Sequence, residues 1–462
     1  MKTAMLLRSC RMPVLAGLSL ALVSLAAAAR AQEAAPSPEP EAVPAATAPR
    51  FHLGGELKTH FRDSKAVEVL DEFPFPPSFH PGNDASIQIF LRTVSPQPSF
   101  EFSTVTLRGE GEIASGVTAK VEVHFSDLYN RNPTSSDDRI LVREAWLRVG
   151  PRPEPLQEAH GSSFYAELGL APRFSKQMTR RLESYGLWGT AVARFEQPQL
   201  QLGGLFGGHV YWRAMVGNGN PLFFRDPNAL AGDNGTPERQ PGGVNPIYQS
   251  GFPIFYDAKP QDLNPSGKFE WGGGLGLRGG GAHAAIDLLG WYFRRDLQDV
   301  VRIRGTSYSG DILLLKGVFV PMPFSGHDKH EAGLNVEARL GGGRLFAQYV
   351  TQEFANLPRR GLEAELAWRL PLHGLFLVGE SPVGNWIQPV VRFSTIDNRF
   401  VTPREFPGPS VGWDWTKVDL GLRIGLVREV DLTAEYTLNS MTVFDGSKLH
   451  PNELLLTLRA GF

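Results

Sequence analysis

The sequence predicts an all-β fold, a transmembrane antiparallel β-barrel of about 16–18 strands, with 18 favoured. Three features of the sequence predict it. The chain begins like an exported protein, it alternates apolar and polar residues with a period of two from residue 51 onward, and its last strand ends on Phe462. Together they indicate a barrel in the outer membrane of a Gram-negative bacterium, with short periplasmic turns and long extracellular loops.

Residues 1–31 have the features of a secretory signal peptide. Basic side chains precede an apolar stretch over residues 14–28, and the small-x-small pattern Ala29-Arg30-Ala31 follows it. The apolar stretch is about 15 residues long, shorter than the roughly 20 that a helix needs to span a bilayer, so cleavage is favoured over a retained anchor. Cys10, the one cysteine, would leave with this segment. The mature chain would then have no disulfide and no thiolate metal site.

Residues 32–50 are rich in Pro, Ala and Glu and nearly lack bulky apolar side chains. Such a segment cannot bury enough apolar surface to become ordered. We expect a flexible periplasmic leader, a spacer rather than a partner-binding element, followed by the barrel over residues 51–462.

The overall composition excludes several classes of protein. No segment after the presequence approaches 18 uninterrupted apolar residues, so membrane-spanning helices are excluded and a barrel is the other way to cross a bilayer. The chain contains 46 Lys and Arg residues against 48 Asp and Glu residues, which indicates no nucleic-acid partner.

The alternation after residue 51 is typical of β-strands. In residues 117–126, Val121 and Val123 alternate with Lys120, Glu122 and similar polar residues. The same pattern recurs in residues 51–61, 331–340, 362–370 and 417–426. A period of two sustained over so many segments indicates strands with one apolar and one polar face.

A soluble β-sandwich also alternates, but its connections are short at both ends. Here short and long connections alternate along the chain, as they do in outer-membrane barrels. The short ones lie near residues 114–116, 279–281, 341–343 and 428–429, and the long ones near residues 62–98, 217–267 and 398–412. Trp271, Trp386 and Trp415 fall near strand ends, where we expect an interfacial girdle.

We expect one strand for each alternating segment. These lie near residues 51–61, 99–113, 116–128, 138–149, 162–171, 190–204, 209–217, 268–278, 282–295, 303–315, 317–324, 330–340, 343–354, 358–370, 386–397, 414–427, 430–439 and 452–462. The pattern over residues 297–330 is ambiguous, which leaves 16 strands as the alternative. A barrel of either size has room for an aqueous lumen.

The last strand carries a candidate signal for the barrel-assembly machinery. Leu458, Ala460 and Phe462 fall on its apolar face, with Thr457 and Arg459 on the other. Gram-negative barrels finish on an aromatic residue of such a strand, so we expect this face to meet lipid and the other to meet water.

Residues 172–188 are the candidate constriction loop. Their charged side chains are Arg173, Lys176, Arg180, Arg181 and Glu183. Folded into the lumen, such a basic loop would favour anions, because fixed positive charge lowers the barrier to their entry. The alternative is an exposed loop whose charges meet lipopolysaccharide phosphates or solvent.

Wall positions on several strands are expected to face the lumen as well. The basic side chains that we expect to face inward are those of Arg108, Arg194, Arg213, Arg278, Arg339, Arg344, Arg369, Arg392, Arg423 and Arg459. Of these, we assign Arg194, Arg213, Arg392 and Arg423 to the pore lining or constriction. Acidic residues occupy other inward positions, and most wall charges are expected to pair across strands rather than contact solutes.

Metal and enzyme functions are not favoured. Asp226, Asn228, Asp233 and Asn234 in the longest loop could supply oxygen ligands for Ca²⁺, but Asx residues are ordinary turn formers and the spacing is not an EF-hand. The His327-Asp328-His330 run is also better explained by turn chemistry than by a zinc site. We expect no cofactor. No G-x-S-x-G or H-E-x-x-H motif occurs, although a barrel could assemble a hydrolase site from separate strands.

Three segments resemble the phosphate-selective porin O/P group of outer-membrane porins. They are Gly169–Phe174 (G-L-A-P-R-F), Tyr211–Gly219 (Y-W-R-A-M-V-G-N-G) and Pro389–Asp397 (P-V-V-R-F-S-T-I-D). The resemblance is diffuse over about residues 51–462 and includes the terminal Phe. It implies a passive diffusion channel that is often trimeric.

We therefore expect a passive diffusion channel for small hydrophilic solutes with a preference for anions, and no enzymatic activity. The expected partners are outer-membrane lipids and lipopolysaccharide, the barrel-assembly machinery, the solutes or anions themselves, and two further copies of the chain in a homotrimer. The principal alternative is an adhesin or structural barrel that acts through its surface loops.

Overall fold

The computed structural model describes residues 50–65, 67–74, 86–92, 98–127, 140–177, 180–184, 186–188, 196–219, 237–238, 247–250, 254–256, 268–297, 302–304, 310–311, 325–372, 374, 376–378, 381–403, 409–443 and 445–462. The expected signal peptide and leader lie outside these residues, except for Arg50. Residues from Arg50 to Phe462 form one compact unit.

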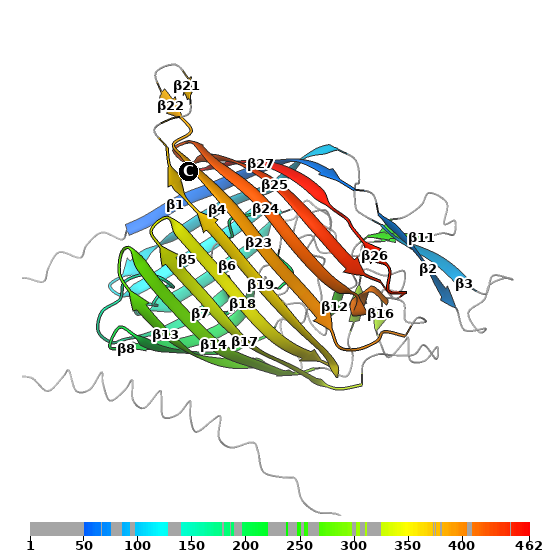
Figure 1. Ribbon diagram of the computed structural model, residues 1–462. Coiled ribbons are helices and arrows are strands. Elements are labelled where there is room, and N and C mark those ends of the chain that lie inside the picture. The colour runs from blue at the N-terminus through cyan, green and yellow to red at the C-terminus, as the bar shows by residue number, and fades with distance from the viewer. Residues whose placement is uncertain are drawn as a thin grey trace, which may run out of the picture. The chain divides into compact units, whose positions relative to one another are not determined.

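Sixteen long strands pair edge to edge, each antiparallel to the next, and close into a barrel (Figure 1). In chain order they are β1 (Arg50–Ser64), β4 (Ser99–Ala114), β5 (Val117–Asp127), β6 (Leu141–Val149), β7 (Ser163–Pro172), β8 (Glu196–Phe206), β9 (Val210–Gly217), β13 (Glu270–Gly280), β14 (Ala284–Asp296), β17 (Asp328–Leu340), β18 (Gly343–Phe354), β19 (Leu357–Trp368), β23 (Trp386–Asn398), β24 (Asp414–Val427), β25 (Val430–Thr442) and β27 (Glu453–Gly461). The two-residue strands β20 (Leu370–Pro371) and β26 (Lys448–Leu449) bring this sheet to 18 strands. The predicted all-β barrel of 16–18 strands is confirmed, with 16 strands in the ring.

β14 and β17 are neighbours in the ring, although the sequence predicts two further strands between them. β14 and β17 pair directly, from Ala284 opposite Leu340 to Asp296 opposite Asp328, so no free edge remains between them. The short strands β15 (Arg302–Arg304) and β16 (Gly310–Asp311) instead join β12 (Ile254–Tyr256) in a separate three-stranded sheet. The predicted barrel strand over 303–315 is therefore wrong, and residues 317–324 lie outside the described part of the chain.

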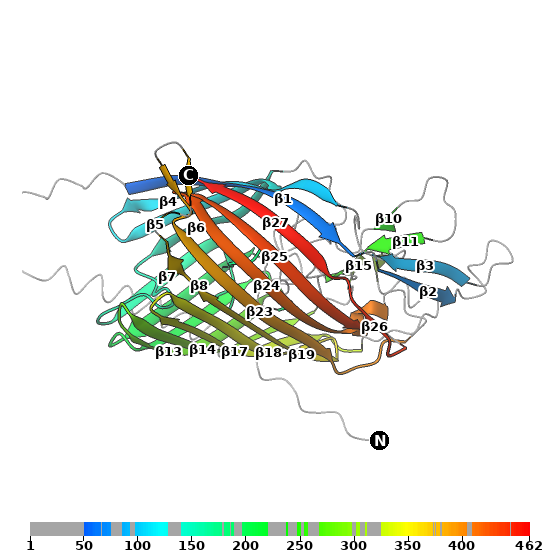
Figure 2. The same ribbon diagram turned by 45° about the horizontal axis from the view of Figure 1, so that its top comes forward.

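Two smaller sheets come from the connections. β2 (Glu68–Pro74), β3 (Ser86–Arg92), β10 (Pro237–Glu238) and β11 (Ile247–Ser250) form a four-stranded sheet beyond the end of the barrel that carries the long loops (Figure 2). β21 (Phe376–Val378) and β22 (Ser381–Val383) form a hairpin near the C-terminus, at the turn end (Figure 1). A 3₁₀ turn, Pro409–Gly412, precedes β24. Among the described residues, no helix is long and apolar enough to cross a membrane.

Alternation along the strands sorts the side chains into an outer apolar and an inner polar surface. On β19, Leu366 and Trp368 are exposed on the outside, whereas Glu363 and Glu365 are buried inside. The same phase holds on β5, where Val121 is exposed and Lys120 is part-buried with its ion-pair partners. An apolar exterior around a polar interior is the arrangement of a transmembrane β-barrel, the architecture of bacterial outer-membrane proteins.

Two of the three predicted girdle tryptophans are inside the barrel. Trp415 is buried, and its indole N–H donates to Asn439 Oδ1 at 3.0 Å. Trp386 lies against Gly425 and beneath the guanidinium of Arg369, 4.1 Å from its ring centre. Trp271 is exposed on the outside, as predicted. Proximity to a strand end indicates depth along the barrel, whereas the phase of the alternation decides the face.

The ring closes between β1 and the last strand. Gly55 and Phe462 exchange two backbone hydrogen bonds, of 3.1 and 3.2 Å. A Cβ on Gly55 would stand 2.3 Å from the Phe462 ring, so only glycine allows the terminal ring to lie there. From this seam Glu56 faces Gly461 and Ser64 faces Glu453 across nine successive pairs (Figure 2).

Candidate functional site in the barrel lumen

The connection after β7 enters the lumen because the strand leaves regular geometry at Gly169. This residue has φ +141°, and a Cβ there would stand 2.2 Å from Ala145 O, so no other residue fits. Beyond this point Ala171, Pro172 and Arg173 are all buried, which ends the strand alternation. We call residues 173–188 the inward loop. The described residues of this segment are buried or half-buried.

The base of the inward loop is held by a closed set of ion pairs. Arg173 Nη1 lies 3.1 Å from Glu331 Oε2 on β17, and Arg173 Nε lies 3.4 Å from Glu270 Oε1 on β13. Lys329 contacts both carboxylates, at 3.2 and 3.3 Å. The guanidinium also stacks 3.8 Å from the centre of the Phe293 ring. Burial would lower the pKa of Arg173, but the two carboxylates outweigh burial and raise it.

The middle of the inward loop docks on the opposite wall. Ser184 Oγ contacts Asp419 on β24 at 3.1 Å and also contacts Glu435 on β25. Arg392 on β23 donates to Ser184 O at 2.7 Å and pairs with Asp419 Oδ2 at 2.8 Å. Arg181 reaches Glu365 on β19 at 2.8 Å. The loop therefore crosses the lumen from β13 to β25.

Three apolar side chains of the inward loop sit on glycines of the inner wall. A Cβ on Gly274 would meet the Phe174 ring at 3.2 Å, one on Gly421 would meet Leu182 at 2.2 Å, and one on Gly361 would meet Trp188 at 2.5 Å. Removing the wall side chain lets each loop residue approach the backbone closely. We call Gly274, Gly361 and Gly421 the glycine sockets.

Glu183 links the inward loop to the first strand. Its carboxylate lies 3.4 Å from Lys58 Nζ on β1 and 3.4 Å from Arg180 Nη2. Burial would raise the pKa of Glu183, but these two cations outweigh it and hold the pKa well below its usual range. Glu183 is therefore a charged tether of the loop.

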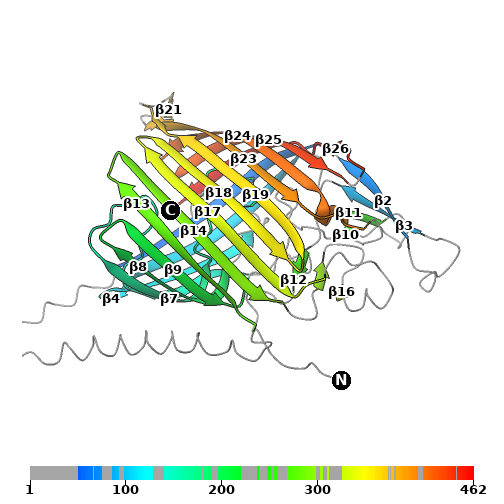
Figure 3. The ribbon, with the colours of Figure 1, turned by 60° about the horizontal axis from the view of Figure 1, so that its bottom comes forward.

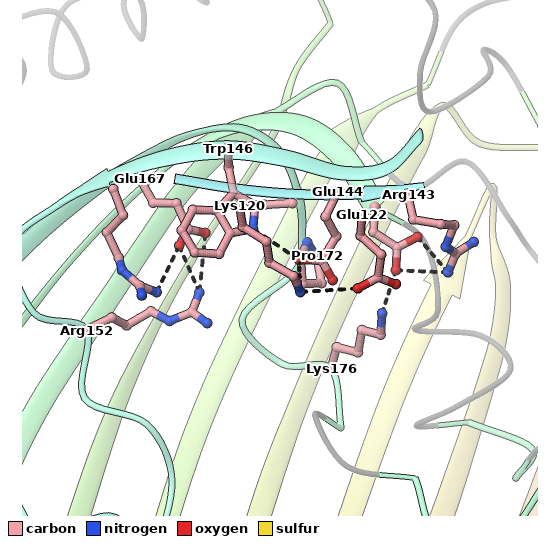
Figure 4. A network of polar contacts seen from close by, with 12 residues as sticks. Lys120, Glu122, Arg143, Glu144, Trp146, Arg152, Glu167, Pro172 and Lys176 are labelled. Atoms are coloured by element: carbon pink, nitrogen blue, oxygen red, sulfur yellow. Dashed lines mark hydrogen bonds and ion pairs between the residues drawn. The ribbon is translucent and has the colours of Figure 1, made fainter. Parts of the chain in front are cut away.

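The wall over β5–β8 carries a chain of ion pairs (Figure 4). Lys120 contacts Glu144 at 2.9 Å and Glu122 at 3.4 Å, and Arg143 contacts Glu196 at 2.7 Å. Consecutive residues Arg143 and Glu144 both face inward because the β5–β6 register shifts between Glu122 and Val123. Sequence reasoning missed this pair, because a bulge breaks the period of two on which it relied.

A cavity of about 1020 Å³ occupies the turn end of the lumen. Nine basic side chains line it against four acidic ones. The basic ones are Lys58, Arg108, Arg180, Arg181, Arg344, Arg369, Arg423, Arg428 and Arg459, and the acidic ones are Glu56, Glu122, Glu429 and Asp431. We call it the basic cavity. Arg108, Arg344 and Arg369 make no ion pair with the residues that the structure describes.

Some of the predicted site residues line the basic cavity, and others make structural contacts inside the barrel. Arg180, Arg181 and Arg423 line the basic cavity. Arg173, Arg213 and Arg392 face inward but hold backbone or carboxylate groups, and Lys176 Nζ lies 2.5 Å from Glu196 Oε1. Arg194 lies outside the described residues. Arg108, Arg344 and Arg369, which the sequence predicts to face the lumen but which were not assigned to the constriction, also line the basic cavity.

The residues that were considered as metal ligands, and not favoured, show no ligand geometry within the described part of the chain. Asp226, Asn228, Asp233 and Asn234 lie outside the described residues. Asp328 pairs with Arg294 at 3.3 Å, and His330 lies 3.6 Å from Glu353. Within the described part of the chain, no three His, Cys, Asp or Glu side chains are placed to hold a metal ion.

No family model and no curated protein matches the chain. Among solved structures, the outer membrane channel DcaP of Acinetobacter baumannii aligns with a TM-score of 0.49 at 10% identity, over 90% of this chain and 98% of that one. OmpT of Vibrio cholerae in its trimer form aligns with a TM-score of 0.46 at 12% identity, over 90% and 100%. The anion-selective porin from Comamonas acidovorans aligns with a TM-score of 0.40 at 9% identity, over 90% and 100%. Likenesses this distant carry no argument about function, which has to come from the residues of this chain.

Proposed function

We propose that this protein is an outer-membrane porin, a passive diffusion channel for small hydrophilic solutes that prefers anions. The observation that carries the proposal is the basic cavity, with nine cationic and four anionic side chains inside an apolar cylinder. Charges of one sign in a cleft with low-dielectric walls focus the field and raise the local concentration of counter-ions.

The three arginines that have no ion pair among the described residues supply most of this preference. Ion pairs such as Arg423 with Asp431, at 3.3 Å, cancel much of their own field. Arg108, Arg344 and Arg369 come from β4, from β18 and from the residue after β19, so their uncompensated charges surround the cavity. An anion that loses hydration water there would gain guanidinium hydrogen bonds in exchange.

Arg180 and Arg181 bring the same charge from the inward loop. Both line the cavity, and the ion pairs of the loop hold its backbone across the lumen. In this proposal the inward loop is the constriction, and solutes pass beside these two guanidinium groups.

Planar-bilayer recording tests the proposal. The purified protein should give discrete conductance steps, and its reversal potential in a KCl gradient should have the sign of chloride preference. Replacing Arg180 and Arg181 with Glu should shift the reversal potential toward cation preference and invert it. Arg360→Glu is the matched control. Arg360 pairs with Asp397 on the outer face, so this substitution changes the charge of the protein without changing the lumen.

Two results would contradict the proposal. Cation preference of the wild-type channel would overturn the assigned selectivity. An absence of conductance steps would favour a barrel that acts through its surface loops.

The assembly and the envelope partners are part of the same proposal. We infer a homotrimer that sits among lipopolysaccharide and outer-membrane lipids after insertion by the barrel-assembly machinery. The apolar exterior supports burial in lipid or against other copies. Light scattering of the detergent-solubilised protein would measure the number of copies directly.

A further inference from the structure

We propose that a second segment enters the lumen from the turn end and, together with the inward loop, closes one half of the barrel, so that solutes pass only through the other half. The second segment is residues 151–160, between β6 and β7, which we call the strap. This inference rests on the proposed channel function.

The strap is longer than the two neighbouring connections at its end of the barrel. β4 and β5 are joined by residues 115–116, and β8 and β9 by residues 207–209. The strap contains Pro151, Pro153 and Pro155, which lack backbone N–H donors, so this stretch needs few partners for its amides.

Arginines of the inner wall hold the strap by its carbonyl groups. Arg278 on β13 donates to Glu154 O at 2.6 Å and to Gln157 O at 2.5 Å. Arg213 on β9 donates to Pro153 O at 2.9 Å. The strap thus reaches from β6 and β7 to β9 and β13, strands that lie side by side in the wall (Figure 3).

Side chains of the strap also fill the lumen beneath it. Arg152 Nη1 lies 3.1 Å from Glu167 on β7, and Arg152 Nε lies 2.8 Å from Glu154 (Figure 4 shows the contact with Glu167). Arg148 on β6 reaches the same Glu167 carboxylate at 3.4 Å. Glu167 and Tyr165 on β7 are both fully buried under these contacts.

Arg213 joins the two inward segments. Its Nη2 donates to Pro153 O of the strap, and its Nη1 donates to Phe174 O of the inward loop at 3.4 Å. The two segments enter from opposite ends of the barrel, so the lumen along β6–β9 and β13 is filled from both sides at this guanidinium.

The basic cavity lies along the remaining strands. Its lining comes from β1, β4, β5, β18, β23, β24, β25 and β27, with the turns between them and the inward loop. None of its lining residues belongs to β6–β9, β13 or β14. Arg213 and Arg278 therefore set the width of the channel by holding the strap, and they act as positioning residues that do not contact the solute.

The first experiment changes the strap. Replacing residues 152–159 with a short Gly-Ser turn should raise single-channel conductance by about twofold, because ion flow scales with the open cross-section. Arg278→Gln should raise it as well, since it releases two strap carbonyls. Arg339→Gln is the matched control, because it removes an inward-facing arginine on β17, two strands from β13, that binds Gly281 O of a turn instead of the strap.

A second experiment measures the rate of thiol labelling instead of ion conductance. It therefore tests this inference separately from the channel function. In a Cys10→Ser background each introduced thiol is unique. Thr106→Cys, in the basic cavity, should react rapidly with a charged, water-soluble thiol reagent. Glu167→Cys should react at least about tenfold more slowly until the strap is shortened, because burial excludes the reagent.

Equal labelling of the two thiols in the protein with an intact strap would overturn the inference, whether or not the protein conducts. An unchanged conductance and an unchanged Glu167→Cys labelling rate after strap shortening would overturn it too. A protein that labels as expected but never conducts would refute the channel function and leave the half-closed lumen standing.

Discussion

At the scale of single residues, arginines inside the barrel have two different roles. Arg173, Arg213 and Arg392 are buried and hold the inward loop, whereas Arg108, Arg344 and Arg369 line the basic cavity without an ion pair among the described residues. The sequence predicts which arginines face inward, since the period of two decides the face. It does not predict their partners, because these come from a loop and from strands distant in the chain. Arg392 and Ser184 are 208 residues apart.

The two roles predict opposite results for the same substitution. Arg392→Gln should destabilise the barrel by about 3–5 kcal/mol, because the buried carboxylates of Asp419 and Glu365 would each lose an ion-pair partner. Among the described residues, Asp419 would keep only Lys417 as a partner, and Glu365 only Arg181. Arg344→Gln should leave stability within about 0.5 kcal/mol of the wild type and reduce the anion preference. Urea titration of the folded protein in lipid vesicles measures the first effect, and the reversal potential measures the second. Equal loss of stability in both variants would contradict this division.

At the scale of elements, the inward loop is positioned by the shape of the wall as much as by charge. The sequence predicts a basic loop after β7, and the resemblance of Gly169–Phe174 to porins implies that it folds inward. The glycine sockets could not be predicted, because a glycine in a strand is equally consistent with a bulge, a bend or a close approach. Only the fold shows that Gly361 and Gly421 lie beneath Trp188 and Leu182.

Adding a methyl group to a socket should therefore displace the loop. In Gly361→Ala the new Cβ would stand 2.5 Å from Cε3 of Trp188, a rigid ring that cannot bend aside. We expect faster trypsin cleavage after Arg180 and Arg181 in the folded protein, together with larger open-channel current fluctuations. Gly290→Ala on β14 is the control, because the nearest atom to its Cβ would be Leu275 O, 3.9 Å away. Cleavage at the same rate in both variants would show that the socket does not hold the loop.

At the scale of the whole molecule, the sequence predicts the architecture well and its circumference less well. Alternation and loop asymmetry are local signals repeated along the chain, and both survive in the ring of strands. The number of strands depends on which edges meet, and the pairing of β14 with β17 removed two expected strands. The strap was missed for a similar reason, since its arginine partners lie on β9 and β13, more than 50 residues further along the chain.

Closure of the ring depends on the first and the last strand of the barrel together, because these two strands pair with each other. Phe462 follows β27 and contributes two backbone hydrogen bonds and an aromatic ring to the seam with Gly55, whereas β27 itself pairs with β25 and β1. Gly55→Val should prevent this contact, because its Cβ would lie 2.3 Å from the ring and 2.8 Å from Thr106 O. We expect a lower folded yield in lipid vesicles for Gly55→Val and for Phe462→Ala, measured from the fraction that migrates as the compact form on unheated gels. The double variant should lose less folded yield than the sum of the losses of the two single variants, because both substitutions remove the same contact. Strictly additive losses of folded yield would show that the two substitutions do not act through the contact between Gly55 and Phe462.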